Sequence, residues 1–315
     1  MKKLNILQLG TMDNKGGAAK VSWNLKNELE KQGNVVSMIV GYKKSNDAGV
    51  FEIFDTPFNR IVSSIIKKNF YQRMSFHLSY WLSNDIFIPL AKKVSGMLPF
   101  KNADIIHAHN LHSNFFNLNE LPTLSHQKPF VWSLHDMWAI TGHNAHAFHC
   151  DHWQTGGCQC KLPDTIPPHK KNNSQKLWEL KKAIYNKSKL HIVVPSQWLY
   201  EKVQLSILKN QEVHLIYNGV DTDIFKPQEK DVAKKKLGLP LDKKIILFAS
   251  KGGSKNIWKG WNFAEDIIEK EKNNHHVLFL CLGGYDADTR LKNVASIEYI
   301  KDKNTETNVL IKPKR

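Results

Sequence analysis

Cysteine is scarce in this chain, with four residues among 315, and long apolar runs are absent. The longest apolar stretches, such as residues 191–195 and 277–282, are far shorter than the ~20 residues that a membrane-spanning helix needs. Hydrophobic residues make up 41% of the chain and charged residues 23%, which is typical of a soluble globular protein. The composition therefore excludes an integral membrane protein built from helical spans.

We do not expect a secretory leader. The chain begins with Lys2, Lys3 and apolar residues, but no cleavage site of small residues follows them. Residues 4–9 run instead into Gly10, which indicates a first strand and its turn. We expect a cytoplasmic protein, in which thiols stay reduced.

Acidic residues are outnumbered: 45 Lys and Arg stand against 29 Asp and Glu, a formal net charge of +16. Such an excess attracts polyanions, whether nucleic acid, an anionic membrane surface or phosphorylated small substrates. The lysines form short scattered clusters. No zinc-finger spacing, aromatic-rich RNA-binding motif or recognition-helix pattern accompanies them, so nucleic acid is not a predicted partner.

Apolar segments rich in β-formers alternate with segments of helical spacing. The expected strands cover residues 4–9, 35–40, 103–109, 129–135, 191–195 and 212–217. A helix is predicted after Gly17, where apolar residues share one face, and Gly33 ends it. Ser196 caps another helix. This alternation predicts an α/β fold with a mostly parallel sheet covered on both faces.

A second series of the same kind begins at residues 243–250 and continues through residues 260–271 and 276–284. We therefore expect two Rossmann-like, doubly wound domains, over residues 1–217 and 231–315, joined by a polar linker over residues 218–230. Ligands of such sheets bind beyond the carboxyl ends of the strands, and two facing domains predict a ligand cleft.

The first predicted strand leads into Gly16 and Gly17, where a loop becomes a helix. Backbone N–H groups and the positive end of the helix can face a phosphate there. The spacing is not GxGxxG, and a glycine pair before a helix is also a common turn, so the residues alone leave both interpretations open.

Several segments together resemble glycosyltransferase family 4, retaining sugar-nucleotide enzymes of the GT-B fold. They are "GGAAKVSWNLKNEL", "ADIIHAHN", "WSLHDMWAITGH", "PSQWLYEKVQLS" and "IYNGVDTDIFKP". The similarity runs from residue 4 to about residue 285 and is strongest to the subgroup of colanic-acid and capsule enzymes. It implies hexosyl transfer from a nucleotide-sugar donor to a glycan or lipid-linked acceptor in cell-surface polysaccharide biosynthesis.

The same resemblance implies roles for individual residues. His135 matches the family's catalytic histidine beside the reacting sugar, and Gly16 and Gly17 match its donor-phosphate loop. Lys259 and Gly260 match the pair that meets the donor diphosphate. GT-B enzymes of this family hold the diphosphate without a divalent metal, so no cofactor is expected for catalysis.

The resemblance weakens in the second domain. Ser250 stands where many family members carry an arginine, with Lys251 and Lys255 as stand-ins for its charge. Residues 225–315 are too few for a complete domain of this type, and the family's pair of glutamates has no match. We expect a truncated second domain and little or no activity. A non-catalytic binding remnant and another GT-B chemistry, such as sugar-nucleotide epimerisation, stay open as alternatives.

Three of the four cysteines fall in an insertion predicted over residues 139–170. Cys150, Cys158 and Cys160, with His143 or another nearby histidine, could supply four ligands to a structural zinc. A reduced loop without metal and a disulfide are the other two interpretations. In each of the three the cluster stabilises the insertion and is not the catalytic centre.

The acceptor side is predicted from two features. His107, His109 and Asn110 follow a buried-type strand and are expected to line the acceptor part of the cleft. Residues 61–98 mix aliphatic, aromatic and basic residues, which suits a helix pair lying on an anionic membrane. Core-facing helices of the first domain are the alternative to this peripheral association.

Overall fold

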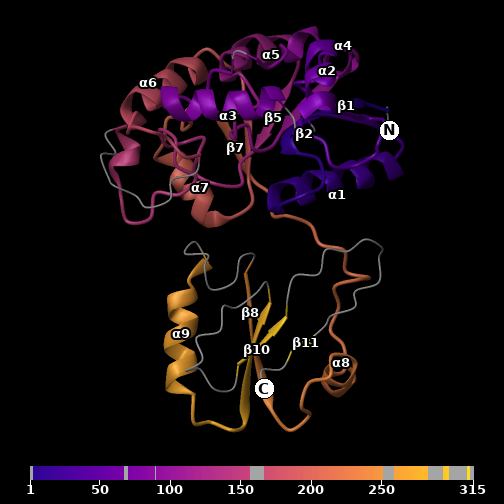
Figure 1. Ribbon diagram of the computed structural model, residues 1–315. Helices are drawn as coiled ribbons and strands as arrows, with labels where there is room; N and C mark the ends of the chain where they lie inside the picture. Colours follow the sequence, from indigo (N-terminus) through magenta and orange to yellow (C-terminus); the bar gives the residue numbers. More distant parts are fainter. Residues whose placement is uncertain are drawn as a thin grey trace. The chain divides into compact units, whose positions relative to one another are not determined.

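The computed structural model describes residues 3–66, 70–88, 90–156, 167–250, 259–282, 294–297 and 311–312. The chain divides into two compact units, Met1–Gly219 and Val220–Arg315 (Figure 1). The division falls within the segment expected to be a linker, whose residues are exposed.

A seven-stranded, all-parallel sheet forms the first unit, with strand order β3-β2-β1-β4-β5-β6-β7. The strands are β1 (Asn5–Met12), β2 (Val35–Tyr42), β3 (Val50–Glu52), β4 (Ile105–Ala108), β5 (Phe130–Ser133), β6 (His191–Val194) and β7 (Glu212–Leu215). The six strands expected from the sequence are confirmed. The short β3 was not predicted, because three residues carry too little periodicity.

Seven helices connect these strands in the described part of the first unit. They are α1 (Gly17–Lys31), α2 (Pro57–Ile66), α3 (Phe70–Leu82), α4 (Leu98–Asn102), α5 (Leu121–Gln127), α6 (Ser174–Tyr185) and α7 (Gln197–Gln204). Helix α1 lies on one face of the sheet and α5 on the other (Figure 1). None of the helices in the described segments has both the length and the apolar character needed to cross a bilayer.

The predicted end of α1 and the predicted start of α7 are both confirmed. Gly33 follows the end of α1 with a φ of +86°, and the Ser196 hydroxyl accepts a hydrogen bond from the Leu199 amide at 3.3 Å, which caps α7. The helix pair expected over residues 61–98 exists as α2 and α3. It ends sooner than expected, because Ser83 adopts a φ of +48° and the chain leaves the helix there.

The core of the first unit lies between the central strands and the helices that cover them. Alternate positions on β1, β4, β5 and β6 are at most 1% exposed: Leu7, Leu9, Ile106, Ala108, Phe130, Trp132, Ile192 and Val194. Because these strands are covered on both faces, their carboxyl ends are the places where polar side chains can meet a ligand.

The second unit has a four-stranded sheet in the order β11-β10-β9-β8 and two helices among its described residues. The elements are α8 (Lys230–Lys236), β8 (Lys244–Ala249), α9 (Trp261–Lys270), β9 (Val277–Leu282), β10 (Val294–Ile297) and β11 (Ile311–Lys312). Strands β8, β9 and β10 run parallel, and β11 pairs antiparallel with β10. Trp261 and Ile268 of α9 pack on Val277, Phe279 and Cys281 of β9.

Candidate functional site

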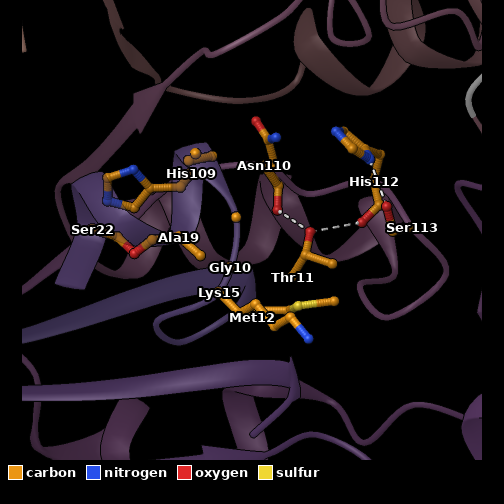
Figure 2. Close-up of a pocket in the computed structure, with 13 residues that line it drawn as sticks. Gly10, Thr11, Met12, Lys15, Ala19, Ser22, His109, Asn110, His112 and Ser113 are labelled. Atoms are coloured by element: carbon orange, nitrogen blue, oxygen red, sulfur yellow. Dashed lines mark hydrogen bonds between the residues drawn. The ribbon is translucent and has the colours of Figure 1, made fainter. Parts of the chain in front are cut away.

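A pocket of about 190 Å³ opens at the carboxyl ends of β1 and β4 (Figure 2). Three segments line it: the end of β1, the start of α1 and the loop after β4. The lining residues are Gly10, Thr11, Met12, Lys15, Gly16, Gly17, Ala18, Ala19, Ser22, His109, Asn110, His112 and Ser113.

The pairing of β1 with β4 brings the two loops together. Gln8 pairs with His107 and Leu9 with Ala108 in parallel register, and the His109 amide donates to the Leu9 carbonyl at 2.9 Å. Figure 2 shows the Thr11 hydroxyl within reach of two carbonyls of the β4 loop, those of Asn110 and His112, each at 3.3 Å. The loop is therefore fixed against the strand that precedes α1.

The start of α1 gives this pocket an anion-binding character. Gly16 has a φ of +107°, which only glycine adopts without strain, and no side chain caps the helix. No acidic residue lies in the first turn. Its backbone N–H groups and the positive end of the helix dipole thus lie at the pocket, and Lys15 adds a cation to the same lining.

A chain of three histidines lies beside the pocket. His109 Nδ1 is 3.0 Å from His135 Nε2, and the two rings stack with centroids 5.3 Å apart. The ring of His107 also stacks on that of His109, with centroids 4.5 Å apart, and its Nε2 is 2.8 Å from the Ser133 hydroxyl. Nε2 of His109 is buried and has no hydrogen-bond partner.

Burial keeps these three imidazoles neutral. It lowers the pKa of His107 to about 4, with a further contribution from His135, and it lowers the pKa of His109 well below its ordinary value. Burial also lowers the pKa of His135, although Asp136 opposes this shift. Neutral rings can donate or accept hydrogen bonds at either nitrogen, which suits the recognition of hydroxyl groups better than the binding of phosphate.

Asp136, directly after His135, forms hydrogen bonds with two polar side chains of the pocket lining. Its carboxylate accepts hydrogen bonds from His112 Nε2 at 2.9 Å, from the side-chain Nδ2 of Asn110 at 3.3 Å and from the Trp138 backbone N–H at 2.9 Å. Burial works against ionisation of Asp136, but the interaction with His112 and these hydrogen bonds outweigh it, and its pKa is lowered. The carboxylate therefore orients Asn110 and His112.

The segment after β5 is fixed by a buried lysine. Lys181 of α6 is fully buried, and its ammonium donates to the carbonyls of Trp138 at 2.7 Å and Thr141 at 3.2 Å. The same ammonium lies 3.6 Å from the centre of the Trp138 ring, whose N–H donates to Asp85 at 2.5 Å. Burial lowers the pKa of Lys181 to about 7, against the opposing effect of Asp85. This network positions the loop that carries His135 and Asp136.

The residues predicted for the site fall into three groups. Gly16, Gly17, His109 and Asn110 line the pocket, while His107 and His135 contact His109 and are not part of the lining. In the second unit, Gly260 directly precedes α9 and has a φ of +67°. Lys259 is the residue before Gly260, and it is exposed. Lys251, Cys158 and Cys160 lie outside the described residues. The roles assigned to all of these residues stay predictions.

Among the residues at the pocket or beside it that the sequence did not single out, four carry polar or charged side chains of interest. Lys15, Thr11 and Ser113 line the pocket, and Asp136 organises it. Two of these had a signal: Lys15 precedes the glycine pair, and Asp136 directly follows His135 at the carboxyl end of a predicted strand. Thr11 and Ser113 carry no comparable pattern, because only the strand register brings them to the pocket.

The described part of the insertion gives His143 and Cys150 separate partners. His143 is buried, its Nδ1 is 2.9 Å from the Ser174 hydroxyl, and its ring stacks on His169 at 4.3 Å. Burial lowers the pKa of both histidines to about 4. Cys150 is buried, and its Sγ lies 3.9 Å from His152 Nδ1. The predicted zinc site stays a prediction, since two of its ligands are not described.

Comparison with known proteins bears on the same segments. The model of the family named Glycosyltransferase Family 4 matches residues 15–224. WcaC of Escherichia coli (strain K12), named as a colanic acid biosynthesis glycosyl transferase, is 25% identical over 234 residues, which cover 69% of this chain and 55% of WcaC. This chain thus aligns with about half the length of its curated relative.

Solved structures show the fold. Sucrose-phosphate synthase from Thermosynechococcus elongatus matches with a TM-score of 0.53 and 13% identity, covering 94% of this chain and 71% of that one. A structure of HepE from Anabaena in complex with UDP-glucose matches with a TM-score of 0.48 and 14% identity, covering 94% and 69%. The predicted fold class, α/β with mostly parallel sheets as in GT-B proteins, is confirmed.

Proposed function

Because this chain belongs to glycosyltransferase family 4, we propose that it serves the transfer of a sugar from a nucleotide-sugar donor to a glycan or lipid-linked acceptor in cell-surface polysaccharide biosynthesis. One observation carries the proposal. The uncapped start of α1 and His109, the member of the buried histidine chain that lines the pocket, lie at one pocket at the carboxyl ends of β1 and β4. Such a pocket has a part suited to phosphate and a part suited to sugar hydroxyls.

Transfer of the sugar leaves negative charge on the departing nucleoside diphosphate, and this charge must be stabilised. The backbone N–H groups of Gly17, Ala18 and Ala19 and the ammonium of Lys15 are the groups that would do so in the first unit. This arrangement needs no metal cofactor for that step. Lys259 and Gly260 of the second unit are the further residues we assign to the donor.

The size of the pocket limits what it takes up. At about 190 Å³ it is smaller than the ~300–1000 Å³ of sites that enclose whole drug-sized ligands. It suits a phosphate with one sugar ring, and not a complete nucleotide sugar. The nucleoside then lies beyond this pocket.

The histidines are assigned to the sugar. His109 lines the pocket with an Nε2 that has no partner, and its Nδ1 shares a single proton with His135 Nε2. If His135 donates, His109 carries its proton on Nε2; if His109 donates, its Nε2 is a hydrogen-bond acceptor. His135 therefore sets the role of His109, and we assign catalytic support to this pair, with His107 and Asn110 on the acceptor side.

We assign the exposed apolar side chains of α2 to an anionic membrane surface, where lipid-linked acceptors reside. Phe58, Ile61 and Ile65 are 58%, 62% and 74% exposed. Trp81, at the end of α3, is 61% exposed and has the Lys170 ammonium 3.4 Å from its ring centre. Apolar side chains mixed with cations favour the interface of an anionic bilayer over water.

Co-sedimentation with vesicles containing phosphatidylglycerol tests this assignment. The double variant Ile61→Ser with Ile65→Ser should bind the vesicles at least tenfold more weakly. The matched control is Leu205→Ser, which removes an equally exposed apolar side chain at the end of α7. Equal binding by all three proteins would remove the membrane from the proposed function.

The transferase proposal is tested by sugar transfer from a panel of nucleotide sugars to lipid-linked and free glycan acceptors. His135→Asn keeps a polar side chain but removes the imidazole ring whose Nε2 contacts His109 Nδ1. Turnover should therefore fall at least tenfold, with little change in donor affinity. Lys259→Ala should weaken donor affinity instead. Ser250, which is buried at the position where the family resemblance implies an arginine, supports the non-catalytic alternative. Donor binding without turnover would favour that alternative.

A further inference from the structure

Two histidines and a glutamate meet on one face of the sheet at its β7 edge. His191 begins β6, while Glu212 and His214 lie two residues apart on β7. The parallel register pairs His191 with Glu212 and Val193 with His214. Because side chains alternate between faces along a strand and aligned residues share a face, all three side chains project from the same side of the sheet.

The three side chains already lie close together. His191 Nδ1 is 3.0 Å from one carboxylate oxygen of Glu212, and His214 Nε2 is 3.2 Å from the other. The three ligand atoms all lie within 4.8 Å of one another. A tetrahedral zinc with bonds of ~2.0–2.2 Å has ligand atoms about 3.4 Å apart. The two histidine–carboxylate distances, each to a different oxygen of Glu212, are near this spacing, and small side-chain rotations would bring one oxygen and both ring nitrogens around an ion.

We propose that His191, Glu212 and His214 form a binding site for a zinc-like divalent cation. Two imidazoles and one carboxylate are a ligand set for zinc, copper or nickel, whereas magnesium and calcium take oxygen ligands. The side chains are 47%, 61% and 41% exposed, so a metal ion can enter and the rotamers can adjust. The fourth coordination position is left for water.

This site is separate from the pocket. His191 and Glu212 stand at the starts of their strands, whereas the pocket lies at the carboxyl ends of β1 and β4. Edge strand β7 pairs only with β6 among the described strands, and the chain runs from it to the end of the first unit at Gly219. A metal ion bridging β6 and β7 would fix this edge strand at its start.

Zinc binding to the metal-free protein, without a polyhistidine tag, tests the site. Titration calorimetry with ZnCl₂ should show one equivalent that is at least tenfold weaker in His214→Ala and in Glu212→Gln. The matched control is His275→Ala, which removes an exposed histidine of the second unit. Saturating zinc should also raise the melting temperature of the unaltered chain by roughly 5 °C, and by much less in the two site variants.

Cu²⁺ gives an independent readout, because electron paramagnetic resonance counts coordinated imidazole nitrogens. The unaltered chain should show two at this site and His214→Ala one, with circular dichroism confirming that the variant is folded. A Cys150→Ser variant separates the cysteine cluster from this site and should keep the equivalent that His214→Ala loses. Zinc binding that is identical in His214→Ala, or that only Cys150→Ser removes, would overturn the proposal.

Discussion

Glycines in two regions of the first unit have opposite surroundings. In the segment that follows β5, a Cβ on Gly142 would lie 2.3 Å from the Ser174 carbonyl oxygen, and one on Gly156 would lie 2.8 Å from the Trp178 ring. At the start of α1, a Cβ on Gly16 or Gly17 would meet no atom within 4 Å. Packing thus requires glycine in the first region. At Gly17 neither packing nor backbone conformation requires glycine, so a substitution there should leave the fold unchanged.

The lysines of the two regions differ as the glycines do. The post-β5 segment takes the Lys181 ammonium into the interior and surrounds it with carbonyls and the Trp138 ring. The α1 loop presents Lys15 to the pocket. In the first region these contacts stabilise the fold and position His135 and Asp136, whereas the second region is where we propose that the donor phosphate binds. Substitutions in the two regions should therefore separate stability from binding.

The largest expected effect concerns the pH dependence of stability through Lys181. Its pKa is about 7 in the folded protein and 10.5 ordinarily, so between these values the unfolded chain binds the extra proton. The free energy of unfolding should rise as pH increases from 7 to 10, by on the order of 4 kcal/mol. Urea unfolding of the unaltered chain and of Lys181→Met measures it. A pH slope that is the same in both proteins would show that Lys181 does not titrate in this way.

Gly142→Ala should come next. The new methyl group would overlap backbone atoms of Ser174, which cannot move aside as a flexible side chain would. We expect a loss of about 3 kcal/mol in the free energy of unfolding. Gly17→Ala is the matched control and should change stability by less than ~1 kcal/mol, because its added methyl group meets no neighbour. Equal destabilisation by the two substitutions would remove the contrast between the regions.

A smaller effect is expected in acid from His107. Burial lowers its pKa to about 4 from 6.5, so the folded protein binds fewer protons than the unfolded chain between these values. Its contribution to stability is complete above pH 6.5 and is lost as pH falls towards 4, by roughly 2–3 kcal/mol. The variant His107→Asn should show a shallower loss of stability over this range. An unchanged acid slope would indicate that this imidazole is already protonated when folded.

The sequence predicted the strands and the pocket glycines because each carries a local signal. Buried parallel strands are continuous apolar runs, and Gly16 and Gly17 sit where a strand-to-helix turn must be. The three histidines could be placed at strand ends for the same reason. Their contact with one another depends on the register of β1, β4 and β5, which no local pattern encodes.

Other features depend on distant segments and could not be predicted. Lys181 lies in a helix rich in lysine, and nothing in its neighbourhood marks it as the one that is buried. The cluster of His191, Glu212 and His214 needs two strands in a particular register. The helices over residues 61–98 were expected, but the break at Ser83 arises from a backbone conformation that serine rarely adopts.

The central claim is that the start of α1 binds the phosphate of a nucleotide sugar. Titration of the ¹⁵N-labelled chain with a panel of nucleotide sugars, followed by nuclear magnetic resonance, tests it even where affinity is weak. We expect that at least one donor shifts the amide signals of Gly17, Ala18 and Ala19, and that Gly17→Ala reduces the affinity for this donor at least tenfold at unchanged stability. Signals that shift only elsewhere, or not at all with any donor, would contradict it.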